Sequence, residues 1–273
     1  MSDSLGSVVD NPLTVRPLRL ELTDVAALMA VERDSLQDSH YTPEQALALL
    51  RRPGRWVHLA CDGDDVVGFC FSFATRDAQW PRLEIDMLGV VPSHRRRGLA
   101  TRLIAAALAD GRGRGIPRAR GVVARDNVGS RKAFLAAGMV VGGQVELLVY
   151  DLLGAEPQSY LPKGWTCVAE PTEPDPATLH AILYDDGGTV RAQARWLQVQ
   201  TLSYSGIWIE DLSASDPQSS ALLSRAVVER AKREGLDETG ILWPQGRDES
   251  ARLAWLRQGY ERIGAYDLLE AAP

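Results

Sequence analysis

Along the first half of the chain, short apolar runs alternate with segments in which apolar residues recur at helical spacing. The former predict strands and the latter predict helices. Short apolar runs predict a hairpin at residues 56–75 that turns at 62–65, and further strands at residues 13–18, 82–92, 119–127 and 144–153. Apolar residues recur at helical spacing over residues 20–35, 42–52, 100–111 and 128–139. This order of elements predicts a mixed α/β domain that ends near residue 153.

Two of these predicted helices have residues suited to their ends. Thr42 stands where an N-cap is expected, and Pro43 follows at the first helical position. Gly138 stands where the helix at 128–139 should end, and glycine readily adopts the left-handed conformation that commonly ends a helix.

The pattern of the first half returns in the second half. Two prolines and two glycines at residues 154–165 predict a linker, bounded at 154–163. Beyond it, three segments resemble segments of the first half: residues 179–197 resemble 56–74, residues 207–212 resemble 83–88, and residues 247–269 resemble 126–153. In the last pair, Gly259 aligns with Gly138 and Trp255 with Phe134. We therefore expect two related domains, 1–153 and 164–273, and expect the second to be truncated and to lack its opening strand and most of two helices.

The composition is that of a soluble globular protein. The chain has 273 residues, 45% of them hydrophobic, and a net charge of -6, which argues against nucleic acid as a partner. No apolar run is long enough to span a membrane, and the N-terminus shows no secretion signal. Three scattered cysteines predict neither disulfides nor a metal site, so we expect a cytoplasmic protein without a metal.

One short segment departs from this acidic balance. Arg95, Arg96 and Arg97 run into Gly98, directly before the predicted helix at 100–111. A helix N-terminus already carries partial positive charge and unpaired N–H groups, so added arginines favour a bound anion there. Glycine would let the backbone approach a pyrophosphate closely, although a solvated basic turn is the alternative.

The second copy lacks this segment. Its corresponding junction, residues 213–223, has no arginine and no glycine, and it carries Asp216 instead. If the arginines served only to build the fold, both copies would need them. The comparison therefore predicts a binding site in the first copy and a scaffold in the second.

These residues resemble a known family. Residues 90–100 follow the pattern V-x-P-x-x-R-x-x-G-x-A, and residues 127–139 follow N-x-x-S-x-x-x-F-x-x-x-G-M. The first pattern resembles the acetyl-CoA loop of the GNAT N-acetyltransferases, and the second resembles that family's next signature. The resemblance covers residues 14–153 well and residues 163–273 as a degenerate second copy. It implies an α/β fold of two GNAT-like domains in tandem, with acetyl-CoA as cosubstrate.

The resemblance also implies which residues bind acetyl-CoA. Leu88 and Val90 would pair through their backbone with the pantetheine arm, and Asn127 and Ser130 would reach it near the thiol. The loop and helix start would hold the pyrophosphate; these are Arg95, Arg96, Arg97, Gly98, Leu99, Ala100 and Thr101. Asn127 is also a good helix cap, and both roles can coexist.

Acetyl transfer to an amine needs a base, because an alkyl ammonium must first lose a proton. Glu84 and Asp86 lie two apart on a predicted strand, where GNAT enzymes commonly place a carboxylate, and we favour Asp86. A polar strand face is the alternative for this pair. The family's usual tyrosine acid is replaced by Phe134, so Tyr150 or water would donate the proton, or catalysis has lapsed.

The expected reaction is direct transfer of an acetyl group to a primary amine of a small molecule or peptide, with the second copy shaping the acceptor site. The alternatives are a lapsed CoA-binding regulatory or scaffold protein, and an acyltransferase that uses a longer acyl-CoA or a carrier-protein thioester. His40 and Tyr41 are candidate acceptor contacts, and His94 could add to the anion site. The expected oligomeric state is a monomer or a homodimer.

Overall fold

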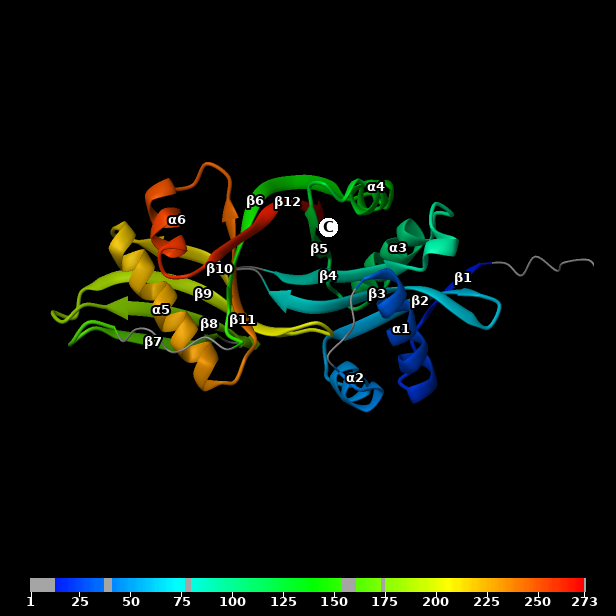
Figure 1. Cartoon of the computed structure of the whole chain (residues 1–273), viewed down its shortest axis with the longest axis horizontal. Coiled ribbons are helices and arrows are strands. Elements are labelled where there is room, and N and C mark those ends of the chain that lie inside the picture. The colour runs from blue at the N-terminus through cyan, green and yellow to red at the C-terminus, as the bar shows by residue number, and fades with distance from the viewer. Residues whose placement is uncertain (1–12, 37–40, 77–79, 154–160, 173–174, 273) are drawn as a thin grey trace, which may run out of the picture. The chain divides into compact units, whose positions relative to one another are not determined.

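The protein is a mixed α/β protein, as predicted (Figure 1). The computed structural model describes residues 13–36, 41–76, 80–153, 161–172 and 175–272. His40 and residues 154–160 of the predicted linker lie outside the described residues. None of the described helices is long and apolar enough to cross a membrane.

The first half of the chain follows the predicted order of elements. Its strands are β1 (Thr14–Pro17), β2 (Arg55–Asp62), β3 (Asp65–Arg76), β4 (Pro81–Val90), β5 (Arg118–Ala124) and β6 (Val140–Asp151). Its helices are α1 (Leu22–Ser35), α2 (Pro43–Leu50), α3 (Leu99–Gly113) and α4 (Val128–Ala136), with a 3₁₀ turn at Pro92–His94. Thr42 caps α2 and forms a capping box with Gln45, and Gly138 adopts φ +90° after α4, so both predicted helix ends are confirmed.

The second half repeats much of that order. Its strands are β7 (Thr166–Thr172), β8 (Asp175–Tyr184), β9 (Val190–Gln200), β10 (Ser205–Ala214), β11 (Glu238–Pro244) and β12 (Glu261–Ala271), and its helices are α5 (Pro217–Arg233) and α6 (Glu249–Leu256). The prediction that this copy lacks its opening strand is wrong, because β7 pairs with β8 as β1 pairs with β2. Only two residues separate β7 from β8, so no counterparts of α1 and α2 fit between them.

The contacts divide the chain into two compact units. The first unit comprises Met1–Phe73 and Ile85–Gly115, and the second comprises Ala74–Glu84 and Ile116–Pro273. In the first unit, α3 packs on β1 and β2, and α1 packs on α2. Helix α3 buries one face, formed by Leu99, Leu103, Ile104, Ala107 and Leu108, which gives its apolar pattern the helical period.

The second unit exchanges strands between the two copies. Its strand order is β5-β12-β6-β11-β10-β9-β8-β7. Strand β12, which ends the second copy, pairs with β5 of the first, and β6, which ends the first copy, pairs with β11 of the second. Each copy therefore donates its last strand to the other. The predicted domain ranges 1–153 and 164–273 stay a prediction.

Aromatic residues fill the core of the second unit. Trp196, Trp243 and Trp255 are each at most 2% exposed, whereas Trp208 is half-buried. The Trp255 ring lies 4.7 Å from that of Tyr260 and 6.0 Å from that of Trp243. These side chains pack under α5 and α6 and make the second copy a well-packed scaffold.

Candidate active site

The start of helix α3 is open to a ligand. Gly98 is its N-cap residue, has φ +76° and supplies no capping side chain, so the first N–H groups of the helix have no side-chain acceptor there. A Cβ added to Gly98 would meet nothing within 4 Å. Arg96 has φ +64° and is the one non-glycine residue with positive φ in the described part of the chain. Such strain is costly and is often found at binding sites.

Three exposed arginines surround this helix start. The Nε of Arg95 donates to the Val90 carbonyl at 3.0 Å, which fixes the loop against the end of β4. Arg97 Nη1 lies 3.7 Å from Asp62 Oδ2, and His94 Nε2 lies 3.1 Å from the same oxygen. Arg96 and most N–H donors of the other two arginines stay available to an anion. The predicted loop residues are thus together in the first unit, with His94 committed to Asp62.

The N-terminus of the corresponding helix of the second copy, α5, is capped by a side chain. Asp216 caps α5, and its carboxylate accepts from the Ser219 backbone N–H at 2.8 Å and from Arg191 Nη2 at 2.7 Å. Burial alone would raise the pKa of Asp216, but the hydrogen bonds of Ser219, Ser215 and Arg191 hold it below its usual value. The helix N-terminus of the second copy therefore carries its own anion.

Near that helix, strands β10 and β11 stop pairing, and the side chain of Arg247 binds the backbone of β10 beyond this point. Strands β10 and β11 pair in parallel only from Gly206 to Ile209 on β10. Beyond this point the guanidinium of Arg247 donates to the carbonyl of Leu212 on β10, and it lies over the ring of Trp243. The repeat pairs Leu212 with Leu88, whose backbone is predicted to bind pantetheine. In the second copy a side chain takes that backbone acceptor.

Strand β4 leads to the open loop. Leu88 and Val90 are half-buried, and Gly89 lies between them at the close approach of β4 to β3. A Cβ on Gly89 would come within 2.3 Å of Ser35 Oγ and 2.7 Å of the Phe69 ring, so only glycine fits. The Val90 carbonyl already accepts the Arg95 side chain, which leaves Leu88 as the freer backbone contact of the predicted pair.

Asn127 and Ser130 lie in the second unit at the start of α4. The side-chain oxygen of Asn127 accepts from the Ser130 N–H at 3.0 Å, so the capping interpretation of Asn127 is confirmed. Asn127 is exposed and Ser130 half-buried. Their contact with the pantetheine arm stays a prediction.

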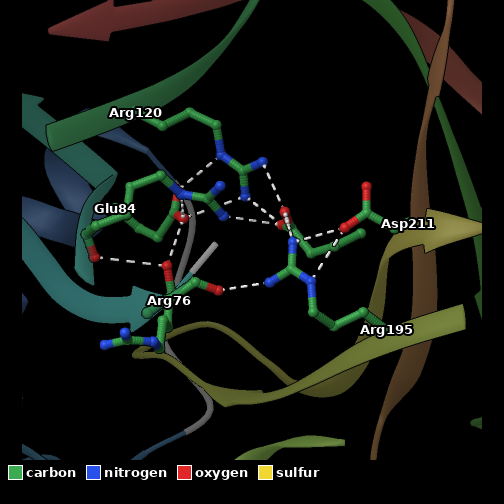
Figure 2. Close-up of polar contacts among 8 residues, drawn as sticks. Arg76, Glu84, Arg120, Arg195 and Asp211 are labelled. Atoms are coloured by element: carbon green, nitrogen blue, oxygen red, sulfur yellow. Dashed lines mark hydrogen bonds and ion pairs between the residues drawn. The ribbon is translucent and has the colours of Figure 1, made fainter. Parts of the chain in front are cut away.

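The two candidate bases differ sharply in their surroundings. Glu84 is buried, and its Oε1 accepts from Thr75 Oγ1 at 2.7 Å and from Arg82 Nε at 2.6 Å. Arg120 donates to both oxygens of Glu84, at 3.0 and 3.1 Å, as Figure 2 shows. A general base needs a lone pair that its own neighbours do not use. Both oxygens of Glu84 already accept hydrogen bonds from Thr75, Arg82 and Arg120, so this carboxylate is poorly placed to accept a proton from a substrate.

Asp86 lies two residues further along β4, in the first unit, and is exposed. Its charge is one of two causes that raise the pKa of the Cys70 thiol to about 12, the larger being burial of that thiol. Cys70 is consequently a neutral core residue and not a nucleophile. Of the two carboxylates, Asp86 is the one accessible to a substrate.

The candidate acid, Tyr150, and Phe134, which replaces the tyrosine of the GNAT resemblance, lie in the second unit. Tyr150 is half-buried on β6, with its ring 5.6 Å from that of Tyr260 and below Lys232 Nζ. Phe134 is 3% exposed and packs against Gly121, where a Cβ would come within 2.3 Å of the Phe134 ring. Phe134 is thus a core residue, whereas the hydroxyl of Tyr150 sits on a half-buried side chain.

Sequence reasoning missed the charged network around Glu84. Arg82 and Arg120 also bind Glu210 of β10, at 3.0 and 2.6 Å, and Arg195 of β9 lies 3.5 Å from Glu210. Figure 2 shows Glu84, Arg120 and Arg195 converging on this cluster. The available signal was the presence of charged residues inside otherwise apolar strand segments. Among the described residues, no group of histidine, cysteine and acidic side chains could hold a metal ion.

Comparisons with known proteins agree with this architecture. Residues 22–139 match the model of the acetyltransferase (GNAT) family. None of the curated protein sequences compared with the chain matches it.

Similar solved structures cover nearly the whole chain. A GCN5-related glucosamine N-acetyltransferase region of a fungal multi-domain GH3 β-N-acetylglucosaminidase aligns with a TM-score of 0.62 at 16% identity, over 96% of this chain and 38% of that one. A GCN5-related N-acetyltransferase from Sphaerobacter thermophilus aligns with a TM-score of 0.61 at 14% identity, over 95% of both chains. A tandem GNAT protein from the clavulanic acid biosynthesis pathway aligns with a TM-score of 0.58 at 15% identity, over 96% and 98% of the two chains.

These identities show the fold alone, and the fold extends over both halves of the chain. The family match rests on the half that contains the open helix start and its arginines. Residues 22–139 therefore form a domain that matches the GNAT acetyltransferase family, and the chain as a whole has the fold of tandem GNAT proteins, with a truncated second copy.

Proposed function

We propose that the protein is an acetyl-CoA-dependent N-acetyltransferase with one cofactor site per chain, formed by residues 95–101 of the first copy. The observation that carries this proposal is the contrast between the two helix starts. Helix α3 begins at an uncapped glycine beside exposed arginines, whereas α5 begins at a carboxylate that caps it. A pyrophosphate fits the first arrangement and is repelled by the second.

When bound, acetyl-CoA would supply an acetyl group activated as a thioester. Arg95, Arg96 and Arg97 would pair with its phosphates, and the N–H groups of Leu99, Ala100 and Thr101 would complete the site. The open side of Gly98 supports this fit, because a bulkier residue would fill the space.

Asp86 is the proposed general base. Its exposure on β4 supports a direct or water-mediated contact with an incoming ammonium, whose proton it would accept. The contacts of Glu84 with Arg82 and Arg120 support a purely structural role for that carboxylate. Most of the rate enhancement would come from holding amine and thioester together.

Tyr150 is the proposed proton donor to the thiolate, with water as the alternative. The burial of Phe134 supports looking elsewhere for an acid, since that position holds no hydroxyl and is closed to solvent. The acceptor is proposed to be a primary amine of a small molecule or peptide. A cytoplasmic location and a monomeric or homodimeric state stay predictions.

A second candidate function is a CoA-binding protein without catalysis, and Phe134 in place of the family's usual tyrosine is the observation that favours it. Both functions require the same cofactor site. Turnover of an amine with release of CoA would separate them.

The test is a calorimetric titration of the full chain with acetyl-CoA at low salt. We expect one site per chain. Arg97→Glu should weaken binding about tenfold or more, because it puts a negative charge beside the phosphates. Arg112→Glu is the matched control, since Arg112 is exposed at the far end of the same helix.

Equal weakening by both variants would mean a general effect of charge and would contradict the site. No binding, or two sites per chain, would contradict the proposal as a whole.

A further inference from the structure

A cavity lies wholly within the second unit. It has a volume of about 230 Å³ and is bounded by the end of β11, the turn at residues 245–247, the start of α6 and the adjoining parts of β6 and β12. Figure 1 shows β6, β11 and β12 of this region. Its lining includes Arg125, Arg247, Arg252, Arg262, Glu146 and Trp243.

The lining of this cavity is strongly biased in charge. Four arginines face only two glutamates, Glu146 and Glu249, among the residues around it. This excess stands out because the chain as a whole has a net charge of -6. A concave site lined mainly by one sign of charge concentrates ions of the opposite sign.

Three of the arginines keep unused N–H donors. Arg262 donates through Nε to Glu146 at 2.7 Å, which leaves its two terminal nitrogens. Arg247 uses one terminal nitrogen on the Leu212 carbonyl. Within the described part of the chain, the Arg125 side chain makes no hydrogen bond and has one ion pair, at 3.8 Å from Asp267.

A guanidinium has five N–H donors in a planar fork that matches carboxylate and phosphate oxygens. The fourth arginine, Arg252, is committed, since it binds Glu146 at 3.0 Å and Glu249. Arg252 thereby contacts both glutamates of the wall, and four arginines against two glutamates leave the lining a net charge of +2.

The wall also contains a buried donor. Trp243 is 2% exposed, and its indole N–H has no hydrogen-bond partner among the described residues. A buried N–H without an acceptor costs free energy. The turn residue Gly246 also lines the cavity and is open, because a Cβ added there would meet nothing within 4 Å.

We propose that this cavity binds a small molecule that carries at least two anionic groups, carboxylate or phosphate, through Arg125, Arg247 and Arg262. The site is separate from residues 95–101 and does not depend on the proposed acetyltransferase activity. The size of the cavity limits the ligand to a metabolite-sized molecule.

The experiment is a calorimetric titration of the full chain at low salt with citrate as the carboxylate probe. Pyrophosphate, the phosphate probe, is titrated into the Arg97→Glu variant so that the loop at 95–101 does not contribute. We expect one site for at least one probe, and the tighter probe identifies the preferred anionic group.

Arg125→Ala and Arg262→Ala should each weaken that binding about tenfold, as expected for losing a charge-assisted hydrogen bond. Both side chains are about half exposed, so the variants should fold, and Arg131 still pairs with Asp267 at 2.7 Å. Arg257→Ala is the matched control, because Arg257 is exposed just after α6 and does not line the cavity.

Absence of binding for both probes, or equal weakening by Arg257→Ala, would overturn the site. Acetyl-CoA is titrated, as an independent readout, into the wild-type chain and into the Arg125, Arg262 and Arg257 variants that keep Arg97. Anion binding without acetyl-CoA binding would refute the proposed function and leave this inference standing, whereas the reverse result would refute this inference alone.

Discussion

Arg120 Nη2 donates to Glu210 Oε1 at 2.6 Å and so joins two strands whose residues lie 90 positions apart in the chain. Strand β5 belongs to the first copy and β10 to the second. Arg120 also binds Glu84, and Arg82 binds both Glu84 and Glu210, so each of the two arginines contacts each of the two glutamates. Buried ion pairs of this kind stabilise little in total but are costly to break on one side.

Glu210→Gln should destabilise the protein by about 3–5 kcal/mol, because it leaves Arg82, Arg120 and Arg195 with one buried carboxylate fewer. Glutamine has nearly the same shape as glutamate, so the loss of free energy of unfolding measures the effect of removing the charge. Urea unfolding measures it. Asp211→Asn is the control, since its side chain is 70% exposed and its pair with Arg195 should be worth less than about 1 kcal/mol. Equal losses in the two variants would contradict the special role of Glu210.

The carboxylate of Glu210 should also make the free energy of unfolding depend on pH in the acidic range. Burial alone would raise the pKa of Glu210, but Arg120 and Arg82 outweigh it and hold this pKa below the usual value of 4.5. In the window between the two values the unfolded chain binds the proton and the folded chain does not. Stability that is fully present above pH 4.5 is therefore lost as the pH falls through the folded pKa. Wild type should lose free energy of unfolding more steeply there than Glu210→Gln, and parallel curves would refute the assignment.

Gly98→Ala should lose acetyl-CoA affinity, because it places a side chain in the open space at the start of α3. It should also cost about 1–2 kcal/mol of stability, since φ is +76°. Gly115→Ala separates the two effects. Gly115 has φ +77° and an equally open side, so it should cost the same stability and leave acetyl-CoA binding unchanged. Equal affinities in both variants would contradict the site.

Asp86→Asn should lower kcat about 10²-fold or more and leave the Kd for acetyl-CoA unchanged, because it removes the proposed base and keeps the shape. A rise of kcat with pH should disappear in the variant. Asp64→Asn, an exposed carboxylate in the hairpin turn of the same unit, serves as the control. Weakened acetyl-CoA binding in Asp86→Asn would point to a cofactor contact and refute the role as base.

Tyr150→Phe should lower kcat about 10²-fold if the hydroxyl donates the proton, as proposed. The ring remains, so its packing against Tyr260 is preserved and stability should change little. Tyr184→Phe at the end of β8 gives the matched loss of a hydroxyl. Unchanged turnover in Tyr150→Phe would remove this residue from the mechanism and leave water as the donor.

Local features were predictable because neighbouring residues determine them. The capping box of Thr42 and Gln45 and the positive φ of Gly138 follow from residue types that suit helix ends. The open start of α3 was predicted from Gly98 and from its absence in the second copy. Strand β6 begins at Val140, four residues before the predicted start, because the glycines at 142–143 concealed its pattern.

Long-range features were not predictable from the same patterns. The exchange of β6 and β12 depends on which strands pair across the copies, and apolar periodicity carries no information about the partner. For the same reason Glu84 looked like a candidate base. Its partner Arg120 lies 36 residues away, and Glu210 lies beyond the linker.

The strand exchange gives the second copy a reason to persist even if it binds nothing. A chain that ended at residue 153 would contain β5 without β12, and the unpaired edge of β5 would be free to pair with other chains. Strand β6 would lose both of its neighbours, β11 and β12. The second copy can therefore lack binding residues without harm to the sheet, whereas its removal would expose strand edges of the first copy to aggregation. The strands of the second copy are thus sufficient reason for the first copy to need it.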